Sequence, residues 1–261
     1  MMKLSSTSFK NAPVFLLMAG VIFVAAVRLP LLWAQDSIII LMQDSLRSIV
    51  HIKAENALAE KGPAQLVRDE TGRVLVVRQL KGATYARTGT GVIIDPSGLI
   101  VTNAHIVRSA ARVSVSFDDG TQKAAELVWV ASDDDVAFLR VRAEQPLPAF
   151  SFSDSDAIKL GEPVYTVGGS EILRGSFIQG KVSGIGMRAP SREDKSVQVD
   201  LIQTSMQDMY QGDSGSPLLD KEGRLLGVMA AVKTTTPYVS YAIPSNRIKR
   251  YYAKFLDAAR R

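Results

Sequence analysis

Short apolar runs separated by turn residues dominate the chain from residue 73 onward. In Arg112-Val113-Ser114-Val115-Ser116-Phe117 apolar and polar side chains alternate with a period of two, which is typical of a half-buried strand. Nine such runs predict strands, and Gly, Pro, Asp and Ser lie between them: 73–79, 91–94, 98–101, 112–117, 135–141, 163–168, 197–203, 224–231 and 239–243. This spacing predicts an all-β sandwich or barrel.

The period changes near the end of the chain. Within 245–260, apolar side chains recur at the spacing of one helix face, at Ile248, Tyr251, Tyr252, Phe255 and Ala259. Ser245 or Asn246 can cap the start of this helix. We expect the helix to dock on the second barrel of the β fold through its apolar face and to leave its Arg and Lys residues in solvent.

The N-terminal segment has a different pattern. Lys3 and Lys10 precede an uncharged apolar run over 12–27, and apolar residues resume after Arg28 as far as Ala34. Counted through Ala34, the segment reaches the roughly 20 residues that span a bilayer. It predicts either an uncleaved anchor, forming one N-terminal transmembrane helix, or a signal peptide that is removed. The positive residues before it favour a cytoplasmic N-terminus, which exports the rest of the chain in either case.

These segments predict three regions. Residues 1–36 form an anchor or signal peptide, residues 37–72 form a linker with a first strand near 48–53 and a polar surface excursion, and residues 73–261 form the main β domain.

Composition limits the kinds of chemistry that the chain can carry. With 261 residues, 46% of them hydrophobic, the chain can bury a large core. The net charge of +5 is spread along the chain, so no basic run predicts nucleic-acid binding. Without cysteine, disulfides and thiolate chemistry are excluded, and two separated histidines make a poor zinc site.

One loop, Gln211-Gly212-Asp213-Ser214-Gly215-Ser216-Pro217, carries the strongest chemical signal. Its glycines permit a tight turn and a close approach of the backbone to a substrate. A serine hydroxyl is a weak nucleophile that needs a neighbouring base, and its oxyanion needs N–H donors. An ordinary turn between strands has a similar composition, so the loop is interpreted together with a candidate base.

Two histidines can supply that base. His51 lies within an apolar run and is interpreted as a strand residue, whereas His105 follows the strand at 98–101. The partner carboxylate of such a base orients the imidazole, and Asp135 directly abuts the apolar run 136–141. The order His105, Asp135, Ser214 matches the chymotrypsin arrangement.

With these three candidates in this order, the chain resembles trypsin-like serine proteases of the HtrA (Deg) type. The matching segments appear in family order and cover about 75–250: TGTGVIIDPSGLIVTNAHIV (88–107), DVAFLRV (135–141), GSFIQGKVSGIG (175–186), LIQTS (201–205), QGDSGSPLLD (211–220) and VSYAIPSN (239–246). The resemblance implies two six-stranded antiparallel β-barrels. It implies that Ser214 is the nucleophile, His105 the general base and Asp135 its partner, and that Gly212 and Ser214 form the oxyanion hole. It also implies protein or peptide substrates, a homo-oligomer of the HtrA trimer type, and chemistry that needs neither a metal nor an organic cofactor.

Several positions depart from the family. HtrA proteases usually carry a PDZ domain after the protease, and we expect this chain to act without one. Asp213 and Ser216 stand where the family usually has Asn and Gly.

Asp208, six residues before Ser214, stands where trypsins select Arg or Lys. In the other interpretation Asp208 faces solvent, and Met209 with the segment 232–241, which contains Ser240, lines an apolar pocket. The segment 188–196 occupies the place of a sensor loop, or is a plain hairpin loop.

The sequence therefore predicts a membrane-anchored serine endopeptidase of the cell envelope, acting in quality control or regulated proteolysis. We expect it at the inner membrane with its protease domain in the periplasm or outside the cell, or secreted or periplasmic after signal cleavage. The alternative is a catalytically weak protein of the same fold that binds or scaffolds.

Overall fold

The computed structural model describes residues 45–55, 61–68, 74–80, 86–168, 175–191, 197–206, 212–230 and 238–260, with only the backbone for 61–68 and 74–80. The chain divides into two units, 1–41 and 42–261, and the described residues all belong to the second. The segment 1–36, interpreted above as an anchor or signal peptide, lies outside them. In the part of the chain that is described, no helix combines the length and apolar character needed to cross a bilayer.

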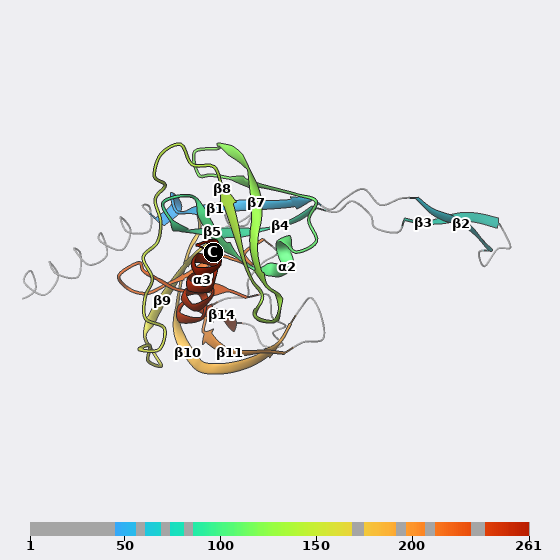
Figure 1. The fold of residues 1–261 in the computed structure, drawn as a ribbon. Coiled ribbons are helices and arrows are strands. Elements are labelled where there is room, and N and C mark those ends of the chain that lie inside the picture. The colour runs from blue at the N-terminus through green and yellow to red at the C-terminus, as the bar shows by residue number, and fades with distance from the viewer. Residues whose placement is uncertain are drawn as a thin grey trace, which may run out of the picture. The chain divides into compact units, whose positions relative to one another are not determined.

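Six antiparallel strands close the first barrel (Figure 1). In barrel order they are β1 (Ile49–Glu55), β4 (Ala86–Asp95), β5 (Leu99–Thr102), β8 (Val136–Val141), β7 (Gln122–Ala131) and β6 (Arg112–Ser116). Alternation along β6 points Val113 and Val115 into the core, where Ile52, Ile100 and Leu139 are fully buried. Closure leaves the barrel without free strand edges.

A second closed barrel follows in the chain, with the order β10 (Phe177–Pro190), β11 (Val197–Thr204), β14 (Ser240–Pro244), β13 (Leu225–Met229), β12 (Pro217–Leu219) and β9 (Pro163–Val167). Its core includes Val164, Ile202, Met206, Leu218 and Ala242. The all-β fold with two six-stranded barrels is as the sequence and the resemblance predicted.

The strand predictions were incomplete rather than misplaced. The long strands β7 and β10 and the short β12 were not among the nine predicted runs. The polar excursion before residue 73 contains β2 (Lys61–Arg68), which pairs with β3 (Val74–Leu80) in a separate two-stranded sheet. β1 belongs to the first barrel, so this barrel begins at Ile49.

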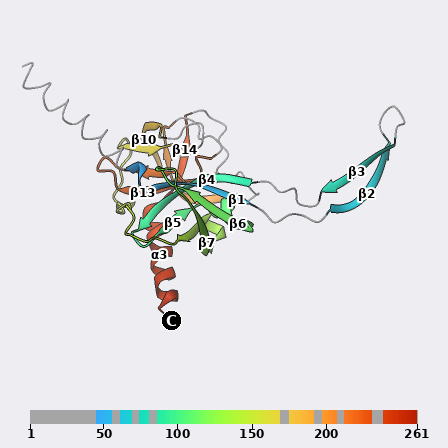
Figure 2. The ribbon, with the colours of Figure 1, turned by 90° about the horizontal axis from the view of Figure 1, so that it is seen from above.

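The C-terminal helix α3 (Ser245–Ala259) confirms the predicted helix and links the barrels. It continues directly from β14 of the second barrel, and the two ribbon views show it beside the first barrel (Figures 1 and 2). Phe138 on β8 is fully buried and makes edge contacts with Tyr252 and Phe255, with ring centroids 6.4 and 5.9 Å away. Trp129 on β7 packs edge-on against Phe255 as well. The helix thus contacts β13 and β14 of the second barrel, as expected, and it also packs on the first barrel with its aromatic face.

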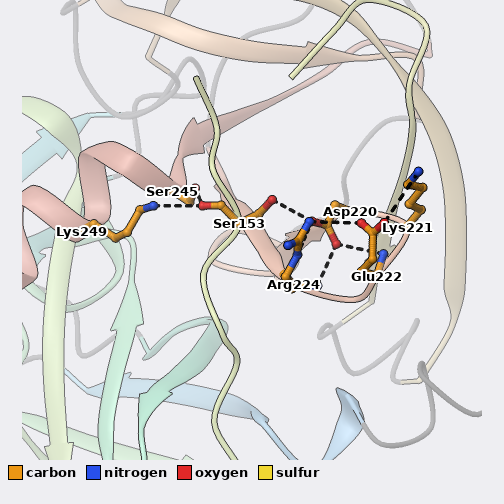
Figure 3. A network of polar contacts seen from close by, with 7 residues as sticks. All are labelled: Ser153, Asp220, Lys221, Glu222, Arg224, Ser245 and Lys249. Atoms are coloured by element: carbon orange, nitrogen blue, oxygen red, sulfur yellow. Dashed lines mark hydrogen bonds and ion pairs between the residues drawn. The ribbon is translucent and has the colours of Figure 1, made fainter. Parts of the chain in front are cut away.

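Polar contacts hold the start of α3 to the second barrel (Figure 3). The hydroxyl of Ser245 and the ammonium of Lys249 both donate to the carbonyl oxygen of Ser153, at 2.9 and 3.1 Å. Ser153 in turn donates to Asp220, which also accepts from Arg224. The predicted capping by Ser245 or Asn246 is wrong, because the N-cap is Pro244 and no side chain caps the helix. The Ser245 hydroxyl bonds to a neighbouring segment instead.

A second polar contact joins α3 to the turn between β4 and β5. The hydroxyl of Tyr252 donates to Asp95 Oδ2 at 2.6 Å, and the backbone N–H of Ser97 donates to Asp95 Oδ1. Hydrogen bonds from Ser97, and then from Tyr252, lower the pKa of Asp95. Burial and the same carboxylate raise the pKa of Tyr252 to about 12. The pair is therefore a phenol donating to a carboxylate throughout the neutral pH range.

Candidate active site

His105 and Asp135 form a buried pair at the end of the first barrel. The His105 Nδ1 atom lies 3.1 and 2.9 Å from the two carboxylate oxygens of Asp135, and the residues are 8% and 7% exposed. Oδ1 also accepts the backbone N–H of His105 at 2.8 Å. A carboxylate with these contacts fixes the tautomer that leaves Nε2 free to accept a proton.

Local backbone structure explains how Asp135 reaches the histidine. His105 lies in the short helix α2 (Ala104–Val107), directly after β5. Asp135 ends the 3₁₀ turn η1 (Ser132–Asp134) in a left-handed conformation, with φ of 54°. Its carbonyl oxygen accepts the backbone N–H of Ala104 at 3.1 Å. Aspartate tolerates this conformation better than most residues, and the contact to α2 offsets its cost.

The loop that carries Ser214 is fixed to the first barrel through Thr90 on β4. The backbone N–H of Thr90 donates to the Ser214 carbonyl at 2.9 Å, and its hydroxyl donates to the Gly212 carbonyl at 2.8 Å. The Thr90 carbonyl accepts the hydroxyl of Thr102, three residues before His105. One threonine therefore connects the serine loop of the second barrel with the strand that leads to the histidine.

Two glycines give the loop its shape. Gly212 and Gly215 have φ of 103° and 90°, values that side-chain-bearing residues rarely adopt. A Cβ atom on Gly215 would stand 2.0 Å from the Thr90 carbonyl oxygen, which is far inside van der Waals contact. The glycine at this position is thus required by the close approach of the loop to β4.

The structure brings the three predicted catalytic residues to the junction of the barrels, where two of them are joined by hydrogen bonds and the third is not. The His105–Asp135 pair is joined by hydrogen bonds, and Ser214 is half-buried in the adjacent loop. Among the residues that the structure describes, no hydrogen bond joins the Ser214 hydroxyl to His105. His51, interpreted as a strand residue, lies on β1 opposite Thr90.

Gln198 is a neighbour of this site that sequence reasoning missed. It comes from β11 of the second barrel, is 6% exposed, and its Nε2 lies 3.5 Å from Asp135 Oδ2. A glutamine in a strand pattern carries no signal of its own. Its place at the start of the predicted strand 197–203 was the only hint.

The predicted pocket residues are described only in part. Asp208 and Met209 lie outside the described residues, as does 192–196 of the segment compared with a sensor loop. Ser240, at the start of β14, is 3% exposed and its hydroxyl lies 3.5 Å from the Met206 carbonyl oxygen. The two positions that depart from the family, Asp213 and Ser216, are both fully buried.

Comparisons with known proteins agree with this geometry. The chain is 30% identical over 214 residues to the "Probable periplasmic serine endoprotease DegP-like" of Rickettsia conorii, covering 78% of this chain and 42% of that protein. It is 30% identical over 197 residues to "Serine protease HTRA1" of Xenopus laevis, covering 76% and 42%. A DegP-like protein of Halomonas elongata is 36% identical over 159 residues, covering 60% and 32%.

The chain thus spans less than half the length of these relatives. A family model described as "Trypsin-like peptidase domain" matches residues 89–228, which is more than half of the chain and includes His105, Asp135 and Ser214. The chain belongs to the trypsin-like peptidase family and is similar to its HtrA and DegP serine proteases.

Proposed function

We propose that this protein is a serine endopeptidase in which Ser214 is the nucleophile, His105 the general base and Asp135 its orienting partner. The observation that carries the proposal is the buried His105–Asp135 pair beside a serine loop that Thr90 fixes in place. The family membership supports the same chemistry.

In the proposed reaction, the Ser214 Oγ attacks the carbonyl carbon of the scissile peptide bond while His105 Nε2 takes the hydroxyl proton. The tetrahedral intermediate collapses as the C–N bond breaks and the imidazolium gives that proton to the departing amine. Water then attacks the acyl-enzyme ester, with His105 again acting as base, and Ser214 is released. Asp135 keeps its negative charge throughout and stabilises the imidazolium.

We assign the oxyanion hole to the backbone N–H groups of Gly212 and Ser214. The positive φ of Gly212 supports a turn in which successive N–H groups converge, as an oxyanion site requires. The contacts of Thr90 to the carbonyl oxygens of the same two residues support a fixed orientation of their peptide groups. The oxyanion would then meet donors that are already in place before reaction.

Labelling with a fluorophosphonate tests the proposed nucleophile. We expect wild type to be labelled covalently and Ser214→Ala to give no signal, because only an activated serine attacks the phosphorus atom. Ser109→Ala, which removes an exposed hydroxyl near His105 in sequence, is the matched control and should label like wild type. Absence of wild-type labelling, with or without unfolded protein present, contradicts the proposal and favours a binding or scaffold role.

We further propose that the chain is exported and anchored to the inner membrane, where it cleaves envelope proteins. The uncharged run 12–27 with Lys3 and Lys10 before it supports this location, as does the periplasmic DegP-like relative.

Phe23→Arg should move the protein out of the carbonate-resistant membrane fraction, since a central arginine costs about 2.5–3.5 kcal/mol on insertion. Phe9→Arg, before the run, should not. Recovery of a shortened, soluble wild-type protein would overturn the anchor in favour of a cleaved signal peptide.

A further inference from the structure

Arg247 of helix α3 is a buried cation that connects three parts of the molecule, so the expectation that the Arg and Lys residues of this helix lie in solvent is wrong at this position. Its side chain is 7% exposed. One guanidinium nitrogen donates to Asp134 Oδ1 at 3.2 Å, while the other donates to Asp200 Oδ2 at 3.0 Å and to the carbonyl oxygens of Val199 and Asp200 at 2.9 and 3.1 Å. A planar guanidinium can serve both sides at once because its donors are arranged as a fork.

The first of these contacts fixes the turn that presents Asp135. Asp134 directly precedes Asp135 in the 3₁₀ turn, and it also accepts a hydrogen bond from the hydroxyl of Tyr251, one helical turn after Arg247. Burial, and then this bond, raise the pKa of Tyr251 to about 12, so its hydroxyl stays a donor. Two side chains of α3 therefore hold Asp134 in place, and the left-handed residue Asp135 follows directly after it.

The second contact fixes the strand that faces Asp135 from the other barrel. Val199 and Asp200 on β11 give their carbonyl oxygens to Arg247, and Asp200 has a positive φ of 52°. Gln198 directly precedes Val199, and its amide donates to Asp135 Oδ2 at 3.5 Å. Arg247 thus holds both the turn that carries Asp135 and the strand that supplies a further donor to the same carboxylate.

We propose that Arg247 is a positioning residue for the catalytic pair, acting through Asp134 and β11 to keep the Asp135 carboxylate against His105. The inference rests on the proposed function, because it assigns Asp135 the role of orienting the base. It predicts that the contact between α3 and the aspartate turn sets the rate of the chemical step rather than the binding of substrate.

Arg247→Met tests this, since methionine keeps an unbranched chain and removes the donors. In the full chain we expect kcat to fall by about 10- to 100-fold with KM little changed, as a small misplacement of catalytic groups does. We also expect the NMR signal of the proton on His105 Nδ1 to move upfield, because its hydrogen bond to the Asp135 carboxylate weakens. The chain has two histidines, so His51→Gln assigns the signals.

A variant that keeps the charge separates positioning from simple loss of charge. If the charge alone mattered, Arg247→Lys would restore kcat in full. Because it keeps the charge but not the fork of donors, we expect it to recover only part of the lost kcat.

The control is Arg250→Met, which removes an exposed arginine of the same helix. It should leave kcat and the His105 NMR signal as in wild type. A folded Arg247→Met with an unchanged NMR signal and unchanged kcat overturns the proposal. Should that variant fail to fold, Tyr251→Phe decides in its place, with the same direction expected. If wild type shows no activity, the proposed function fails, while the NMR signal still tests the positioning.

Discussion

Replacing Asp135 by Asn is expected to lower kcat by about 10⁴-fold, the loss typical of triads that keep their geometry but lose this carboxylate. Asp135 accepts hydrogen bonds from both the backbone N–H and the ring Nδ1 of His105. An asparagine amide offers one acceptor and one donor in the same place. The donor would favour the imidazole tautomer that carries its proton on Nε2, which cannot accept the Ser214 proton.

Asp133→Asn is the matched control, because Asp133 lies in the same 3₁₀ turn and is exposed. It should retain kcat within a factor of about two, in keeping with a surface substitution. Both variants are compared by steady-state cleavage of an unfolded protein and by the rate of fluorophosphonate labelling. A loss below tenfold in Asp135→Asn would show that His105 does not depend on this carboxylate for its orientation.

Replacing Phe138 by Ala is expected to lower the free energy of unfolding by about 3–5 kcal/mol, the usual loss for a buried Phe. Phe138 is fully buried between the first barrel and α3, where it contacts Tyr252 and Phe255. The truncation removes the edge contacts to both rings and leaves a cavity between β8 and α3. The measurement is urea unfolding, with the slope checked for a change in cooperativity.

Phe177→Ala serves as the comparison. Phe177 stacks on Tyr165 with centroids 5.3 Å apart but is 42% exposed, so its truncation should cost roughly 1 kcal/mol. Equal losses for the two variants would mean that the packing between α3 and the first barrel adds nothing special to stability.

The parts of this structure that the sequence predicted are those encoded locally. The alternation along β6 and the helical spacing after residue 245 identify strand and helix because each pattern repeats within a few residues. The pairing of His105 with Asp135 was predicted from a resemblance together with residue types that have a known chemical use. Ser214 was located by the glycines around it, which the structure requires through positive φ and close approach to Thr90.

The contacts that escaped prediction join residues far apart in the chain. Gln198 reaches Asp135 across the barrel junction, and Arg247 reaches Asp134, yet both residue types are common on surfaces. β7 was missed although it contains an apolar run at 127–131, and its residues are half-buried or exposed rather than buried. The cap of α3 was assigned wrongly because Ser245 found a partner at Ser153, on a segment that local rules do not include.

The position of α3 also bears on the order in which the protein is made. Arg247 and Tyr251 follow both barrels in the chain, and they hold the turn that presents Asp135. During synthesis from the N-terminus, both barrels emerge before these two side chains are available. The serine loop and the histidine are therefore present on the nascent chain earlier than the contacts that fix the aspartate turn. The aspartate turn therefore gains these contacts only once α3 has docked.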